Sequence, residues 1–166
     1  KAIRPMSGKV KAALKNVKIK YGTLKGNGYR PAEDTIYLED NVSKMIIEHE
    51  VGHAIEGKLF DAGKVREIKQ QLTDGLGIAD IRQMTGISAD GKKQTVYVVE
   101  SPNLIDIYQG RIYADSREDC LDAEGNIDIE KMDEFISVAY QYYMDNPKTM
   151  KKWFPELYKL VKESIE

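Results

Sequence analysis

The sequence predicts an α+β domain that is mostly helical, with a small sheet beside the helix that carries the only two histidines. Two observations support this fold class. Apolar residues recur at helical spacing in the middle and in the last quarter of the chain, and short β-prone runs lie between these segments. The chain has 166 residues, 42% of them hydrophobic, which is enough for one domain with a core and short for two. We therefore expect a single domain over residues 1–166, which could be a piece of a longer protein.

The N-terminal part is expected to contain one helix and two strands. Residues 7–17 carry apolar side chains at the spacing of one helix face, and residues 17–24 alternate apolar and polar as a half-buried strand does. Residues 25–35 contain the glycines and the proline of a turn. The run "TIYLED" at 35–40 then predicts a second short strand.

The histidines are expected on the next helix. Asn41 or Ser43 can cap it, and its helical pattern continues to about Leu59. A further helix is expected over residues 61–73. The side chains of the first of these helices that are expected to face the core are those of Ile47, Val51, Ala54 and Ile55.

The rest of the chain predicts two strands followed by helices. The run "KKQTVYVVES" at 92–101 is strongly β-prone, and "LIDIYQGRIYAD" at 104–115 is expected to be a second strand. A helix is expected over 129–146, where Pro147 stops it, and another over 148–165.

Charge and composition exclude several classes of partner. The net charge is −2 and lysines alternate with acids, so no basic face for nucleic acid is expected. No apolar run approaches the roughly 18 residues that span a bilayer, so no membrane partner is expected. The single cysteine, Cys120, excludes an internal disulfide, and the acids around it disfavour a nucleophilic thiolate. Oligomeric state is left open.

The pattern His49-Glu50-x-x-His53 predicts a zinc hydrolase site. Histidines four residues apart lie on one helix face, so both imidazoles can bind one ion. Glu50 falls beside the pair and can take a proton from a metal-bound water. The alternative is that these are ordinary polar residues of a helix. Gly52 destabilises a helix, so we expect another backbone or a substrate to approach it closely.

A catalytic zinc site needs a third protein ligand, and spacing alone does not choose one. Glu56 lies too near the axis of the same helix to complete a tetrahedron easily. We interpret it either as a partner that orients a histidine or as a surface acid. The distant candidates are the acids of the C-terminal half, namely Glu118, Asp119, Glu130, Asp133 and Glu134.

The motif "HEVGHAIE", followed later by "DEFISVAYQYYMDNPKTMKKWFPELY", resembles the anthrax lethal factor-like and Pro-Pro endopeptidase-like zinc metallopeptidases. The resemblance covers residues 35–60 and 105–160. It implies a zincin-like fold of the gluzincin type, an endopeptidase activity on a peptide or protein substrate, and Glu134 as the third zinc ligand. It also implies a tyrosine shortly before that ligand which hydrogen-bonds the oxyanion. Tyr113 is our first choice for this residue and Tyr108 our second.

The chain departs from this family at two points. The second acid of the family's later helix aligns with Val138, and Glu56 could supply the orienting carboxylate instead. The gap between His53 and Glu134 is also longer than in lethal factor-type enzymes. By analogy with such enzymes, the strand at 35–40 is expected to pair with an extended substrate through its edge.

Two other functions stay open. The C-terminal region, including "YQGRIY" at 108–113, is similar to phage minor head (head morphogenesis) proteins. The alternative function is therefore a head-associated structural or assembly domain that keeps an active or vestigial zinc site. A secreted effector peptidase is the other, if the chain is a fragment. A cytoplasmic or virion-associated location is otherwise favoured.

Overall fold

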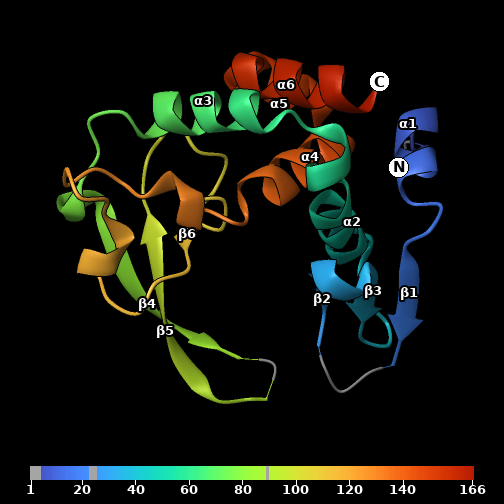
Figure 1. The fold of residues 1–166 in the computed structure, drawn as a ribbon, viewed down its shortest axis with the longest axis horizontal. Coiled ribbons are helices and arrows are strands. Elements are labelled where there is room, and N and C mark those ends of the chain that lie inside the picture. Colours follow the sequence, from blue (N-terminus) through green and yellow to red (C-terminus); the bar gives the residue numbers. More distant parts are fainter. Residues whose placement is uncertain (1–4, 23–25, 89) are drawn as a thin grey trace. The chain divides into compact units, whose positions relative to one another are not determined.

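The computed structural model describes residues 5–22, 26–88 and 90–166. This part of the chain contains six α-helices and two three-stranded sheets, which confirms the mixed α+β fold (Figure 1). By their internal contacts the residues form two compact units. The first unit comprises Lys1–Ala62 and Ile136–Glu166, and the second comprises Gly63–Phe135. The expectation of one domain over residues 1–166 stays a prediction.

The sheet of the first unit has β3 (Thr35–Leu38) at its centre. It pairs in parallel with β1 (Lys18–Tyr21) and antiparallel with β2 (Gly28–Arg30). All four residues of β3 are buried, which accounts for the β-prone run at 35–40. Because both edges of β3 are occupied, the expectation that this strand pairs with a substrate is wrong.

The two outer strands of this sheet also differ from the sequence prediction. All four residues of β1 are exposed, so the half-buried strand expected over 17–24 is an exposed edge strand. Residues 23 and 24 of that expected strand lie outside the described residues. β2 falls inside the segment 25–35 that was expected to be only a turn, and its chain continues into a short 3-10 turn at Pro31–Glu33.

The helices of the N-terminal part begin at serine caps. α1 (Gly8–Ala13) starts after Ser7, whose hydroxyl accepts from the backbone N–H of Val10, and it is shorter than the expected 7–17. α2 (Lys44–Leu59) starts after Ser43, whose hydroxyl accepts from the N–H of Ile46. Of the two expected caps, Ser43 is therefore the one used.

α2 carries its apolar side chains into the core of the first unit, as predicted. Val51, Ala54 and Ile55 are buried, and Ile47 is half-buried. β2 and β3 contact α2, so the small sheet lies beside the helix that carries the histidines (Figure 1).

The C-terminal part contains α4 (Phe135–Asp145), α5 (Pro147–Trp153) and α6 (Pro155–Ile165). The helix expected from residue 129 begins only at Phe135, because Ile129–Lys131 form a separate 3-10 turn capped by the Asp128 carboxylate. The helix expected over 148–165 is divided at Phe154. Pro147 and Pro155 each stand at the first position of a helix, where a missing N–H costs nothing.

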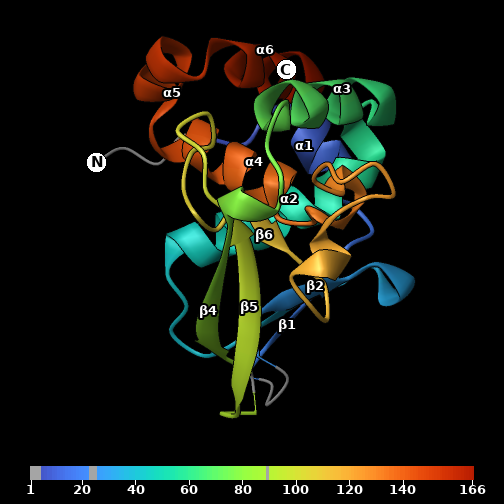
Figure 2. The ribbon, with the colours of Figure 1, turned by 90° about the vertical axis from the view of Figure 1, so that its left-hand side faces the viewer.

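The second unit contains α3 (Ala62–Thr73) and an antiparallel sheet in the order β4-β5-β6. β4 (Ile81–Ile87) and β5 (Lys93–Val99) form a long hairpin, and β6 (Arg111–Ile112) covers only the part of β5 nearest its C-terminal end (Figure 2). The sequence analysis missed β4. Its side chains are mostly exposed, so apolar periodicity is weak there.

The strand expected over 104–115 is reduced to β6, because residues 104–110 form turns. Gln109 is fully buried in these turns. Its side-chain amide donates to the carbonyl of Phe135 at 3.1 Å and accepts from the N–H of Ile105 at 2.7 Å. A Cβ at Gly110 would lie 2.1 Å from the carbonyl oxygen of Val99, so only glycine fits beside β5.

In the described part of the chain, no helix combines the length and the apolar character that crossing a bilayer requires. Cys120 is buried, its thiol lies 3.4 Å from the carbonyl oxygen of Ser116, and burial raises its pKa. These features agree with the expectation that Cys120 is not a nucleophile.

We predict that Cys120 reacts with dithiodipyridine at least about a hundredfold more slowly in the native protein than in urea, because reaction requires an opening that exposes the thiol. The measurement is the release of thiopyridone with time, with and without denaturant. Equal rates in the two conditions would contradict the burial of this residue.

Candidate metal centre

The helix with the two histidines packs against α4 at Gly52. A Cβ at Gly52 would lie 2.8 Å from the Cα of Ser137 and 3.2 Å from its carbonyl oxygen. No other residue type fits such an approach without moving one of the helices. The close backbone that the sequence led us to expect at Gly52 is therefore that of α4.

Polar contacts extend this pairing along both helices. Nδ1 of His49 lies 3.3 Å from the side-chain oxygen of Gln141, and the Lys44 ammonium lies 3.4 Å from the Asp145 carboxylate. Gly52, nearer the C-terminal end of α2, contacts Ser137 near the N-terminal end of α4. Lys44, at the N-terminal end of α2, contacts Asp145 at the C-terminal end of α4. The two helices are thus antiparallel, and the α4 partners occupy one helix face.

Glu134 lies in the turn immediately before the same helix. It directly precedes Phe135, the first residue of α4, and it stands three residues before Ser137, which continues the spacing of the face that contacts α2. In the antiparallel pairing, this end of α4 corresponds to the part of α2 beyond Gly52, where His53 lies. The packing of α4 on α2 therefore explains how Glu134 reaches the histidines.

The ligand atoms of His49, His53 and Glu134 all lie within 4.8 Å of one another. His49 is 8% exposed and Glu134 is 4% exposed, while His53 is half-buried. The imidazole rings meet edge to face with their centroids 4.9 Å apart. Atoms bound to one ion at about 2 Å are about 3 to 4 Å apart, so small side-chain rotations complete the set. These three residues can hold a metal ion.

The other acids considered as third ligand do not join such a group within the described residues. Glu118, Asp119 and Asp133 are exposed, and Glu130 forms an ion pair with Arg66 at 2.6 Å. The role of Glu56 as an orienting acid stays a prediction.

α2 is buried on every side over residues 48 to 52, which include His49 and Glu50. Five consecutive residues, 48 to 52, are buried, although a stretch enclosed in this way is ordinarily apolar all round. Glu50, the expected base, is 7% exposed. Glu48 is equally buried and was not singled out from the sequence. It forms an ion pair with Lys44 at 2.7 Å, and burial raises its pKa. Buried charge of this density is typical of a functional site.

Tyr113 contacts the carboxylate of Glu134. Its hydroxyl donates to Oε1 of Glu134 at 2.5 Å. The side chain is exposed as a whole, but desolvation of its hydroxyl end, followed by this hydrogen bond, raises the pKa of the phenol. The guanidinium of Arg111 lies over its ring at 4.5 Å from the centroid. Tyr113 is therefore held as a neutral donor against a candidate ligand. Its expected role at the oxyanion stays a prediction, as does that of the exposed Tyr108.

Gln141 is a residue of the site that the sequence analysis missed. When Nδ1 of His49 carries the proton, it donates to the side-chain oxygen of Gln141 and leaves Nε2 directed to a metal. The family resemblance places an orienting acid at the position of Val138, which is buried and apolar. Spacing in the sequence could have pointed to Gln141. It stands seven residues, or two helical turns, after Glu134 and therefore lies on the same face.

Comparisons with protein-family models, with curated proteins and with solved structures found no match to this chain.

We predict opposite effects for two glycine substitutions in α2. Gly52→Ala should lower the free energy of unfolding by about 1 to 3 kcal/mol, because the new methyl group meets the backbone of Ser137. Gly57→Ala, where nothing lies within 4 Å of the added Cβ, should instead raise it by about 0.5 to 1 kcal/mol. Urea unfolding followed by circular dichroism measures both. Equal effects of the two substitutions would contradict the close packing of α2 on α4.

We also predict that Gln141→Leu weakens Zn²⁺ binding by about 10- to 100-fold, because His49 loses the acceptor that orients its ring. Gln141→Glu keeps an acceptor at this position and should retain the affinity. Competition with a chromogenic chelator measures both constants. If the two variants lose affinity equally, Gln141 does not act through its side-chain oxygen.

Proposed function

We propose that this chain is a zinc-dependent endopeptidase that hydrolyses peptide bonds through a metal-activated water. The observation that carries the proposal is that His49 and His53 of α2 and Glu134, in the turn just before α4, have their ligand atoms within 4.8 Å of one another, with Glu50 buried on the same helix as the histidines.

The donor set favours zinc among the common metals. Two imidazole nitrogens and one carboxylate oxygen form a three-ligand set that leaves a fourth position open, as in catalytic zinc sites. Calcium and magnesium prefer oxygen ligands alone, and this group offers only one carboxylate. The resemblance to lethal factor-like and Pro-Pro endopeptidase-like metallopeptidases implies the same ion.

The residues of the site have distinct roles in the proposed reaction. A zinc ion held by His49, His53 and Glu134 would supply an acidified water and a Lewis acid for the substrate carbonyl. Glu50 would act as the general base that accepts the proton of the attacking water and would later return this proton to the leaving amine. Tyr113 holds Glu134 through its hydroxyl and can turn to donate to the oxyanion as charge develops there. Gln141 fixes the ring of His49.

A structural or assembly domain of a phage head protein is the second candidate. The similarity of the stretch "YQGRIY" at 108–113 to phage minor head proteins supports it. Gln109 is fully buried with its amide bonded on both sides, and Gly110 lies against the backbone of β5. In this case the metal site would be retained for stability or be vestigial.

Metal analysis combined with a cleavage assay separates the two candidates. We expect about one equivalent of zinc in the unsubstituted protein and in Glu50→Gln, and its loss in His53→Ala, which lacks one of three ligands. We expect peptide cleavage by the unsubstituted protein to fall by about 100- to 10,000-fold in Glu50→Gln, which lacks the base. The substrate for this assay is a proteome-derived peptide library read by mass spectrometry.

Each result of this experiment has a distinct meaning. Zinc that is bound without cleavage would favour the structural candidate. A protein that binds no zinc would overturn the proposal. Cleavage that persists in Glu50→Gln would remove Glu50 from the mechanism.

A further inference from the structure

The second unit has an open sheet edge on the β6 side of β5. In the β4–β5 ladder, Ser88 donates to Lys92 and Glu100 donates to Asp80, so the even-numbered residues of β5 turn their backbone groups toward β4. The odd-numbered residues turn theirs to the other side. The N–H of Val99 accordingly bonds the carbonyl of Gly110 at 2.7 Å, and Tyr97 pairs with Ile112.

β6 ends before it reaches the first half of β5. Its register covers only Tyr97 and Val98 of β5. A continued β6 would place Ala114 opposite Thr95, but the chain turns away at Tyr113, whose N–H donates to the carbonyl of Lys131 at 3.2 Å. The N–H and C=O groups of Lys93 and Thr95 therefore point along an edge that β6 does not cover.

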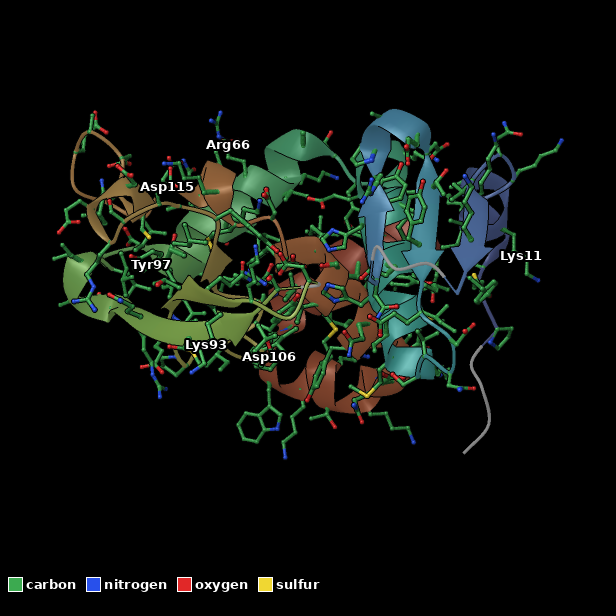
Figure 3. The ribbon with its side chains drawn as sticks, turned by 90° about the horizontal axis from the view of Figure 1, so that it is seen from below. Lys11, Arg66, Lys93, Tyr97, Asp106 and Asp115 are labelled. Carbon is green, nitrogen blue, oxygen red and sulfur yellow. The ribbon has the colours of Figure 1, made fainter. Side chains whose placement is uncertain are left out.

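A cavity of about 510 Å³ lies where the two segments diverge. Gln94–Val96 of β5 line one side of it, and the segment Arg111–Asp115 lines the other. Figure 3 labels Lys93 and Tyr97 on β5 and Asp115 on the segment that follows β6. The cavity is mostly polar, and its wall includes the ring of Tyr113, whose hydroxyl bonds Glu134.

We propose that the edge of β5 at Lys93–Val96 binds an extended peptide, which adds to the sheet as a strand in the place where β6 stops. That the peptide is the substrate rests on the proposed peptidase function, whereas the binding itself does not. Backbone hydrogen bonds to Lys93 and Thr95 hold the peptide irrespective of its sequence.

The charged side chains of the cavity give this edge a preference among peptides. Arg111 and Lys131 line it together with Asp115 and Asp119. Lys131 already donates to the backbone carbonyl of Asp119 at 2.6 Å, and Arg111 stacks on the ring of Tyr113. Alternate side chains of an added strand face this wall, so polar and charged residues are preferred at every second peptide position.

The test uses the chain of residues 1–166 with Glu50→Gln, so that bound peptides are not cleaved, and random heptapeptides displayed on phage as the probe. Synthetic copies of enriched peptides are then titrated while amide hydrogen exchange is followed residue by residue. Strand addition predicts slower exchange at the amides of Lys93 and Thr95. The amides of Gln94 and Val96, which face β4 in both states, should not change.

Two proline variants form a matched pair. Thr95→Pro removes an N–H from the proposed edge, and Thr85→Pro removes one from the opposite edge of the same hairpin. Thr85 and Thr95 are exposed and stand directly across from each other, in a pair whose backbone groups point outward. Thr95→Pro should weaken peptide binding by about tenfold or more, and Thr85→Pro should leave it unchanged.

The proposal is overturned if no peptide is enriched, if protection does not alternate along β5, or if Thr85→Pro weakens binding as much as Thr95→Pro. Because binding is measured without catalysis, these outcomes are independent of the peptidase proposal. A zinc peptidase that shows no protection at Thr95 would contradict this inference alone. A chain that binds peptides at this edge and cleaves none would contradict the proposed function alone.

Discussion

The approach of α4 to α2 at Gly52 is the constraint on which the candidate site depends. It brings the backbone of Ser137 to a distance at which a Cβ at position 52 could not be accommodated. The same antiparallel packing places Gln141 beside His49 and carries Glu134 toward His53. The motif on α2 supplies two ligands by local spacing alone, and the third comes from how closely the two helices pack.

This packing encloses an unusual amount of charge. Glu48, His49 and Glu50 are all buried on α2, and Glu134 is buried at the start of α4. Burying ionisable groups costs several kcal/mol each unless partners compensate, so a fold selected for stability alone would place apolar residues here. Lys44 and Tyr113 offset part of this cost through direct contacts with Glu48 and Glu134. A bound cation would offset more, which gives the buried acids a physical reason to be retained.

The sequence predicted what local spacing determines. α2, its Ser43 cap and the shared face of His49 and His53 follow from helical periodicity and capping chemistry, and Gly52 indicated a close neighbour without identifying it. Glu134 could not be chosen by spacing and entered through a family resemblance. The contacts of Gln141 and Tyr113 depend on the partner that each segment meets in the fold. Spacing places Gln141 on the helix face of Glu134, but it does not identify His49 as the partner of Gln141 or Glu134 as the partner of Tyr113.

The order of strands in the two sheets could not be predicted from local sequence either, and this order decides which strand edge is open to a peptide. The run at 35–40 was correctly predicted as a strand, yet its position at the centre of its sheet is set by pairing with β1 and β2, and this removes it as a docking edge. In the second unit β6 is too short to cover β5, because the turns before it and the bond from Tyr113 to Lys131 after it limit its length. An edge that binds peptides must combine unused backbone groups with a wall that contacts side chains. Of the two strands, only β5 combines these features, and Tyr113 links that wall to Glu134.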